Sequence, residues 1–499
     1  MKKCKTAKLI LVLTIVLSIL LTQPVFVLAA KKTTDINLEY LKSVMDMIKE
    51  KHKGEVTDEQ LIEGALKGIF DTMDPYTTYY TPEQAEEFLV KVEGIYEGIG
   101  IIMSKLDEYI VITKVFSASP AERAGLLQGD KIVSVDGDSV VGMGADMVSS
   151  RIQGENGTMV TLGVIRSGYK EILIFDIIRD EIKISPLNYE IKGDVGYIKI
   201  DVFNSNTLEY FTEAIHDTDS RNINKIVLDL RNNPGGEVRQ AVELAKFFVP
   251  AGLITKLEFQ SDEDKDIEYR SNLTNPKFKV AVLVNGMSAS ASEILAGAIQ
   301  DTGVGKLIGT RTFGKARVQS IIPLLTPEAY EKYREKLDVE LVNAYDLILK
   351  HRVAPLKSEI IGMAKITTGM YTTPNGRKID GIGLEPDLYV ENDLQTDSIS
   401  IFNIQKLSRT TKPGINDEGL DVYNAEKILS LLGYEVGLPD YRLDEKTFNA
   451  VWKFRVDNGL YPGGILDFTT QEALNDKLDR LILEYDKQYV KALEVLGDT

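Results

Sequence analysis

Three serines that alternate with alanine at 288–292 form the part of the chain best suited to nucleophilic chemistry. The apolar run 280–284 before them is typical of a buried strand, and 292–299 after them has the pattern of a helix. At a strand-to-helix turn, free backbone N–H groups and the positive end of the helix stabilise a developing negative charge. A serine at this turn can therefore act as a nucleophile, and the residues alone leave three alternatives: Ser288, Ser290 and Ser292.

The base that such a serine needs is better supplied by a lysine than by a histidine. None of the three histidines of the chain lies in a motif, which disfavours a Ser–His–Asp triad: His52, His216 and His351. Burial lowers the pKa of a lysine and leaves a neutral amine that can accept a hydroxyl proton. Lys315 stands among small and apolar residues, and if its segment is extended, Gln319 points to the same face and could orient the amine.

The segments 282–294 and 312–319 closely resemble the carboxy-terminal processing, or tail-specific, peptidases. In that family the middle serine of Ser-Ala-Ser-Ala-Ser is the nucleophile, and the lysine of Phe-Gly-Lys is the general base. The resemblance implies a catalytic site of Ser290, Lys315 and Gln319, with serine and lysine 25 residues apart as in the family. It implies no metal or cofactor, and no spacing of His, Cys, Asp or Glu in the sequence predicts a metal site.

The segment 230–236 resembles the family's oxyanion-hole loop. A glycine there lets a backbone N–H approach the acyl oxygen without an intervening side chain. The resemblance implies that Gly235 or Gly236 is one donor, with Gly235 favoured, and that the amide of Ala291 is the other. The alternative is an ordinary strand, turn and helix.

Residues 95–180 resemble a PDZ domain, because a glycine-rich loop and a second motif at 119–132 stand at the right distance. The loop resembles the one whose backbone N–H groups bind the C-terminal carboxylate of a peptide. The residues expected to bind peptide tails are Gly98, Ile99, Gly100 and Ile101. Gln153 stands where many members have arginine, so an arginine-dependent contact from this domain to the protease core lacks its residue.

The implied fold class is multidomain, α/β and α+β, with a protease core of the ClpP/crotonase type. The predicted segments are 1–30, a signal peptide or membrane anchor; 34–90, a helical region; 95–180, the PDZ domain; 181–400, the protease core with a helix-forming insertion at 326–361; 419–474, a small three-helix domain resembling peptidoglycan-binding domains; and 475–496, an amphipathic helix. In the three-helix domain, Trp452 and Phe454 are expected to pack in or beside the core rather than to contact sugar.

The N-terminus predicts export. Lysines at 2, 3, 5 and 8 precede an uncharged apolar run at 9–30, which is long enough to cross a bilayer and also offers signal-peptidase sites. The rest of the chain is therefore expected outside the cytoplasmic membrane, anchored or secreted, and associated with the cell wall. The only cysteine, Cys4, precedes this run, so no disulfide is expected.

Together these features predict an exported serine endopeptidase that binds the C-terminal tails of protein substrates and cleaves peptide bonds with a Ser–Lys dyad. The net charge of −17 argues against nucleic acid as a partner. Peptidoglycan and a second copy of the chain, held through terminal segments, are further expected partners. The alternative from another class is a non-catalytic, cell-wall-attached adaptor that binds peptides, and the intact serine and lysine favour the peptidase.

Overall fold

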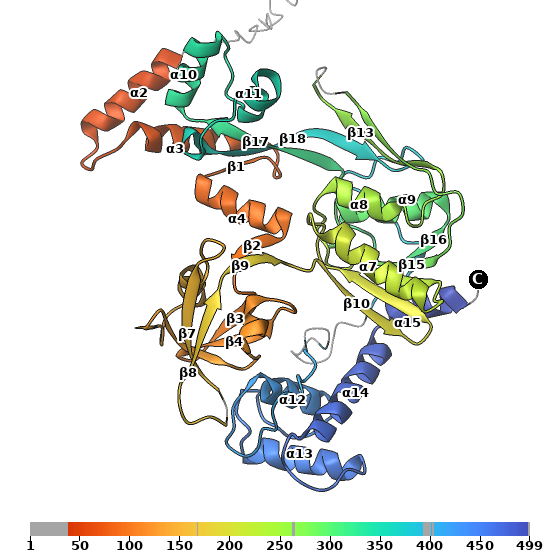
Figure 1. Ribbon diagram of the computed structural model, residues 1–499. Helices are drawn as coiled ribbons and strands as arrows, with labels where there is room; N and C mark the ends of the chain where they lie inside the picture. The colour runs from red at the N-terminus through yellow and green to blue at the C-terminus, as the bar shows by residue number, and fades with distance from the viewer. Residues whose placement is uncertain (1–37, 167, 262–264, 393–400, 402–403, 498–499) are drawn as a thin grey trace, which may run out of the picture. The chain divides into compact units, whose positions relative to one another are not determined.

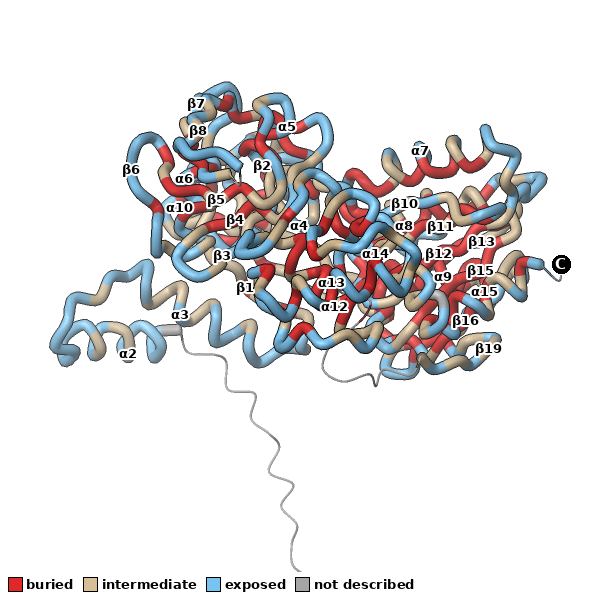
Figure 2. Tube along the Cα trace, turned by 90° about the horizontal axis from the view of Figure 1, so that it is seen from below, coloured by how far each residue is buried: buried red, intermediate tan, exposed pale blue. Residues whose placement is uncertain are grey.

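The structure, a computed structural model, describes residues 38–166, 168–261, 265–392, 401 and 404–497 (Figure 1). The chain forms two compact units, residues 1–69 and 70–499. The described part of the first unit consists of α2 (Leu38–Lys51) and α3 (Asp58–Phe70), and no residue of α3 is buried (Figure 2). The predicted signal or anchor at 1–30 lies outside the described residues. Within the described residues, no helix is both long enough and apolar enough to cross a membrane.

The second unit begins with a short strand and a capped helix. β1 (Thr78–Tyr80) pairs antiparallel with a strand of the protease core. α4 (Pro82–Glu93) starts at Thr81, whose hydroxyl accepts a hydrogen bond from the Gln84 N–H, and it ends at Gly94 in the left-handed conformation. The segment 34–90, expected to be helical, therefore also contributes a strand to the core.

The PDZ domain is a small antiparallel sheet closed by two helices, as the sequence predicted. The strands follow the order β3-β4-β5-β7-β8, and β2 and β9 form a separate pair: β2 (Ile95–Gly98), β3 (Ile101–Leu106), β4 (Tyr109–Val115), β5 (Lys131–Val135), β6 (Asp138–Ser139), β7 (Met159–Ile165), β8 (Leu173–Ile178), β9 (Asp180–Lys183), α5 (Pro120–Ala124) and α6 (Ala145–Ile152). Alternate strand residues such as Ile110, Ile112 and Val164 are fully buried, so one face of the sheet forms the core of this domain.

The protease core is built on a six-stranded sheet of order β10-β11-β12-β15-β16-β19, in which only the first pair is antiparallel. Its strands are β10 (Leu187–Lys192), β11 (Val195–Ile200), β12 (Lys225–Asp229), β15 (Lys279–Val284), β16 (Gly305–Gly309) and β19 (Leu388–Tyr389). Figure 2 shows that these strands hold much of the buried chain. Buried on both faces, they are rich in valine, isoleucine and leucine.

Each face of this sheet is covered by helices. One face packs against α7 (Thr207–Ser220), α8 (Val238–Ala245) and α9 (Ala291–Thr302) through residues such as Ile226 and Leu228. The other face packs against α15 (Lys487–Gly497), where Tyr489, Ala492 and Leu496 meet Val227. The alternation of Ile226, Val227 and Leu228 between the two faces follows from the pleat of the strand.

A second, antiparallel sheet has the order β1-β18-β13-β14, with β17 also paired to β18. Its remaining strands are β13 (Gly252–Phe259), β14 (Ile267–Ser271), β17 (Arg317–Leu325) and β18 (Ile360–Thr372). Between β17 and β18 the chain forms α10 (Pro327–Leu337) and α11 (Ala344–His351), whose apolar residues make a small cluster with Leu325. The insertion expected at 326–361 is thus helical and packs on the end of β17.

The C-terminal helical domain contains α12 (Leu420–Leu431), α13 (Glu445–Asp457) and α14 (Phe468–Tyr485) around one buried cluster. Phe454 lies in this cluster as expected, whereas Trp452 is 47% exposed. The expectation of a single helix at 475–496 was wrong, because the helix is interrupted at Asp486. The Asp486 carboxylate accepts the N–H of Tyr489 at 3.0 Å and so caps a new helix, α15.

Candidate active site

Ser290 occupies the turn between β15 and α9 in a conformation that only a well-supported site retains. Its backbone has φ 56° and ψ −116°, a region that a residue with a Cβ rarely adopts and that costs about 1–3 kcal/mol. Its N–H donates to Glu293 Oε2 at 3.0 Å, and its carbonyl accepts the N–H of Ile294 at 3.0 Å. The strained turn places Ser290 at the start of α9, where the helix dipole favours negative charge.

Hydrogen bonds distinguish the three serines that the sequence left as alternatives. Ser288 and Ser292 are fully buried, and each hydroxyl donates to a carbonyl of the 230–236 loop: Ser288 to Leu230 at 2.8 Å and Ser292 to Asn233 at 3.0 Å. The Ser290 hydroxyl donates to no described residue, and its residue is 8% exposed. Ser288 and Ser292 therefore fasten the turn to the neighbouring loop, and Ser290 retains the reactive hydroxyl.

One buried carboxylate joins the serine segment to the lysine segment. Glu293 Oε2 accepts the N–H groups of Ser290 and Lys315 at 3.0 and 2.8 Å, and Oε1 accepts the hydroxyl of Thr312 at 2.5 Å and the N–H of Gly314 at 2.7 Å. Burial raises the pKa of Glu293, and the four donors oppose that rise. The carboxylate therefore fixes the backbone of Ser290 relative to that of Lys315. Sequence reasoning assigned Glu293 no role, although its position three residues after Ser290 is a capping-box signal.

A tyrosine supports the same connection from β18. The hydroxyl of Tyr371, a residue 2% exposed, lies 3.0 Å from the carbonyl oxygen of Ser290 and 2.9 Å from that of Lys315. It can donate its proton to either oxygen. Tyr371 thus packs directly behind the candidate catalytic pair.

Lys315 lies in the irregular segment just before β17, with its side chain partly buried. Burial lowers its pKa, and the positive charge of Lys365 lowers that pKa further. Lys315 Nζ lies 4.7 Å from the centre of the Tyr76 ring, and none of the hydrogen bonds among described residues uses this nitrogen. The amine is thus more readily neutral than a free lysine, and it rests on an aromatic face.

Gln319 is not hydrogen-bonded to Lys315. Its Nε2 donates to the carbonyl of Arg317 at 3.1 Å and to the hydroxyl of Thr367 at 3.4 Å. Two features explain the difference from the expectation: Lys315 precedes the strand, and the β17–β18 register shifts between Val318 and Gln319. The alternation of an ideal strand therefore does not relate the two side chains.

The residues around Tyr76 also belong to the site's surroundings, which the sequence did not reveal. Asp74 accepts the Thr77 hydroxyl at 2.7 Å and the Thr367 hydroxyl at 3.1 Å, so the turn that carries Tyr76 is tied to β18 beside Gln319. The aromatic residues of the segment 70–82 carry no sequence signal that one of them lies against the lysine.

The loop 230–236 approaches Ser290 closely enough to require glycine. Gly235 has φ +104°, and a Cβ there would lie 2.8 Å from both the Ala289 carbonyl oxygen and the Ser290 Cβ. Its N–H donates to Asn233 Oδ1 at 2.8 Å. By contrast, none of the hydrogen bonds among described residues uses the N–H of Gly236 or of Ala291. Although the sequence favoured Gly235 as a donor, these other two amides have the free N–H groups.

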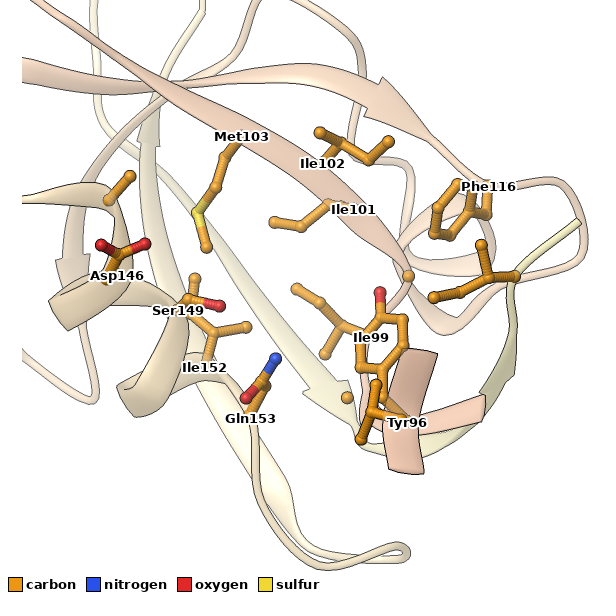
Figure 3. A pocket seen from close by; sticks show the side chains of 15 residues that line it. Tyr96, Ile99, Ile101, Ile102, Met103, Phe116, Asp146, Ser149, Ile152 and Gln153 are labelled. Carbon is orange, nitrogen blue, oxygen red and sulfur yellow. The ribbon is translucent and has the colours of Figure 1, made fainter. Parts of the chain in front are cut away.

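The PDZ loop borders a groove of about 380 Å³ between β3 and α6 (Figure 3). All four predicted residues line it: Gly98, Ile99, Gly100 and Ile101. Gly100 has φ +84°, and a Cβ there would lie 2.3 Å from the Ser119 Cβ, so the loop requires glycine at this position. Gln153 lies at the same end of the groove.

Tyr96 is a further groove residue that the sequence did not single out (Figure 3). Its ring packs over Gly98, where a Cβ would lie 2.9 Å from the ring. Burial raises the pKa of Tyr96 to about 12, although hydrogen bonds from the backbone N–H groups of Ile101 and Gly100 act to lower that pKa. The phenol is therefore neutral at the end of the groove formed by the glycine loop.

Comparison with known proteins agrees with this architecture. Residues 194–390 match peptidase family S41, residues 98–174 match the PDZ domain, and residues 26–84 match the N-terminal domain of the activating protease CtpB. The chain belongs to the carboxy-terminal processing serine peptidases of family S41, which confirms the resemblance seen in its motifs.

Two relatives and one solved structure illustrate the similarity. The chain is 31% identical over 459 residues to carboxy-terminal processing protease CtpB of Bacillus subtilis (strain 168), covering 90% of this chain and 87% of that protein. It is 30% identical over 488 residues to a probable CtpA-like serine protease of Staphylococcus aureus (strain N315), covering 97% and 89%. A solved structure of the photosystem II D1 C-terminal processing protease aligns with 72% of this chain and 90% of its own, at 24% identity and a TM-score of 0.37.

Proposed function

We propose that this chain is an exported endopeptidase in which Ser290 is the nucleophile and Lys315 the general base. The observation that carries the proposal is the Glu293 carboxylate, which binds the backbone N–H of both residues while Ser290 keeps the only uncommitted hydroxyl of the serine cluster. Membership of a serine peptidase family supports the same assignment.

The reaction would proceed by two proton transfers through Lys315. The neutral amine accepts the Ser290 hydroxyl proton as Oγ attacks the peptide carbonyl, and the resulting ammonium then protonates the leaving amine. Water, deprotonated by the same amine, releases the acyl group. The burial of Lys315 favours this cycle, because it lowers the pKa and so increases the neutral fraction.

The lysine side chain must rotate before it can act. Its Nζ rests 4.7 Å from the centre of the Tyr76 ring, a contact that stabilises a cation by about 0.5–2 kcal/mol depending on its burial and a neutral amine by less. Loss of that contact is a small cost, so substrate binding can readily bring the amine to Ser290. Gln319, now bonded to Thr367, would orient the amine after that rotation.

Backbone amides would stabilise the oxyanion. The N–H of Ala291 lies next to the nucleophile at the start of α9, and the 230–236 loop passes close by, since a Cβ on Gly235 would lie 3.0 Å from the Ala291 nitrogen. Gly236 is the better candidate, since the N–H of Gly235 already donates to Asn233. Such donors each contribute about 3–4 kcal/mol to transition-state stabilisation in serine peptidases.

Tail recognition belongs to the PDZ groove in this proposal. Residues 98–101 would bind the terminal carboxylate of a partly unfolded protein, and the apolar side chains of β3 and α6 would hold the preceding residues. Export follows from the apolar segment at 9–30. The helical domain around α13 would attach the enzyme to peptidoglycan, and the exposed ring of Trp452 would contact the sugars. Two copies of the chain would form a homodimer through their terminal segments.

Cleavage of an unstructured protein by the full chain tests the catalytic assignment. We expect Ser290→Ala and Lys315→Ala to abolish cleavage, and Lys306→Ala, an exposed lysine paired with Asp387, to leave it unchanged. Equal cleavage by all variants would reject the dyad. If the unaltered chain neither cleaves nor reacts with a covalent serine reagent but binds C-terminal peptides, the adaptor function replaces the proposed one.

A further inference from the structure

Arg231, at the start of the proposed oxyanion loop, is held by two carboxylates. Asp229 is close to it in the sequence, and Asp486 comes from near the C-terminus. The Arg231 Nε donates to Asp229 Oδ1 at 2.9 Å, and its two terminal nitrogens donate to the two oxygens of Asp486 at 2.8 and 2.9 Å. Gln488 accepts a further bond at 3.1 Å. A guanidinium with two paired carboxylates has a defined orientation that a single ion pair does not give.

Asp486 lies where the chain returns to the protease core from the helical domain. Its Oδ1 accepts the N–H of Tyr489 and, at 3.1 Å, the side-chain amide of Asn392. Asn392 stands where the chain leaves the core, and its own Oδ1 accepts the N–H of Gln488 at 3.2 Å. Asn392, the last described residue before the helical domain, and Asp486, which follows α14, are therefore joined at the side chain that binds Arg231.

From Arg231 the contacts continue into the candidate active site. Asn232 and Asn285 exchange two hydrogen bonds, at 3.0 and 2.9 Å, and Asn285 opens the turn that leads to Ser290. The carbonyl of Asn233 accepts the N–H of Ala289 at 3.0 Å. A shift of Arg231 would thus move the loop that carries the glycine amides and the turn that carries the nucleophile.

One side of Arg231 borders a cavity, so its position there depends on the ion pairs and not on packing. A cavity of about 1040 Å³ is bordered by Asp229, Arg231, Asn285 and Asp486, so the guanidinium faces open space there. Arg231 is nevertheless largely buried, and Asp229 and Asp486 are almost fully so. In such surroundings the loss of one carboxylate frees the side chain to move into the cavity.

We propose that Asp486 is a positioning residue for catalysis, which fixes the 230–236 loop through Arg231 and so links the helical domain to turnover. The inference rests on the proposed role of that loop in binding the oxyanion. Asp486→Asn leaves Arg231 paired with Asp229, so no buried charge is left without a partner, and the fold is retained. What is lost is the bidentate contact that orients the guanidinium toward α15.

The test compares full-length Asp486→Asn with Glu494→Gln, the same chemical change at an exposed carboxylate of α15, the helix that Asp486 caps. We expect Asp486→Asn to lower kcat about tenfold or more with KM within about twofold, because misplaced oxyanion donors act on the transition state. Glu494→Gln should match the unaltered chain. An unchanged kcat in Asp486→Asn, or a fall fully accounted for by unfolded protein in a thermal melt, would overturn the inference.

A double-mutant cycle tests the route through Arg231. If Asp486 acts through this side chain, Asp486→Asn should have no further effect on kcat in an Arg231→Gln background, whereas independent additive losses would contradict it. The rate at which a fluorophosphonate labels Ser290 reports the same loop without turnover, since its phosphonyl oxygen needs the same donors. Equal labelling rates of Asp486→Asn and the unaltered chain would overturn the inference. If the reagent does not label the unaltered chain at all, both the proposed function and the inference are rejected.

Discussion

Replacing Glu293 by glutamine tests whether one carboxylate sets the geometry of the catalytic pair. The change keeps the shape of the side chain but turns one acceptor oxygen into an NH₂ donor. Four donors face the carboxylate, two on each oxygen. Only the Thr312 hydroxyl can rotate to accept a proton, so the NH₂ group should face Thr312 and Gly314, leaving the Gly314 N–H without a partner.

The size of the effect follows from this arrangement. A hydrogen bond to a charged group contributes about 1.5–3 kcal/mol, and an unsatisfied buried N–H costs about 1–3 kcal/mol. Relief of the buried charge, whose burial raises the pKa of Glu293, offsets part of this. We expect Glu293→Gln to lower the free energy of unfolding by about 2–3 kcal/mol. We also expect kcat to fall at least about tenfold, equivalent to about 1.4 kcal/mol, because Gly314 immediately precedes the base.

Urea unfolding and cleavage of an unstructured protein measure the two effects. The matched control is Glu385→Gln, which removes an exposed carboxylate paired with Arg311 and should change the free energy of unfolding by less than about 1 kcal/mol. The reasoning is refuted if Glu293→Gln has the kcat of the unaltered enzyme and a free energy of unfolding within about 0.5 kcal/mol of it.

Two further predictions concern the base and the peptide groove. Because Lys365 lowers the pKa of Lys315, Lys365→Met should raise that pKa and move the acid limb of the kcat/KM profile to higher pH. An acid limb that stays in place, or moves to lower pH, would contradict the assignment of Lys315 as the group that must be neutral. In the groove, Gly100→Ala should abolish binding of peptides with a free C-terminal carboxylate, measured by calorimetry, since its Cβ would clash with Ser119. Gly125→Ala, strained but facing open space, is the control, and equal loss of binding in both would point to backbone strain alone.

The sequence predicted the class of protein and its PDZ domain because their signals are local. The serine cluster, the Phe-Gly-Lys segment and the PDZ loop each lie within a few residues, where turn chemistry and helix starts leave recognisable patterns. The choice among Ser288, Ser290 and Ser292 could be made only by analogy, because their partners, Leu230 and Asn233, come from a loop almost 60 residues away.

The residues that support Ser290 and Lys315 could not be predicted from the sequence for the same reason. Tyr76 reaches Lys315 from another part of the chain, and Glu293 binds donors that lie about twenty residues further on. The expected contact between Lys315 and Gln319 failed because Lys315 precedes β17, so the alternation of a strand does not extend to it, and because the pairing of β17 with β18 shifts register at Gln319. Trp452 and Phe454 were expected to pack in or beside a core; Phe454 is buried in the cluster, whereas Trp452 is exposed.

The meeting of Asn392 and Asp486 makes the helical domain a detachable module. Since the two side chains are joined by a 3.1 Å hydrogen bond, a linker of a few glycines could connect them, and the core would keep α15 and every strand of its sheet. A module with adjacent ends can be exchanged, lost or acquired while the strands of the host stay in place. The peptidase core could thus carry different domains at this position, provided that each keeps Asp486 bound to Arg231.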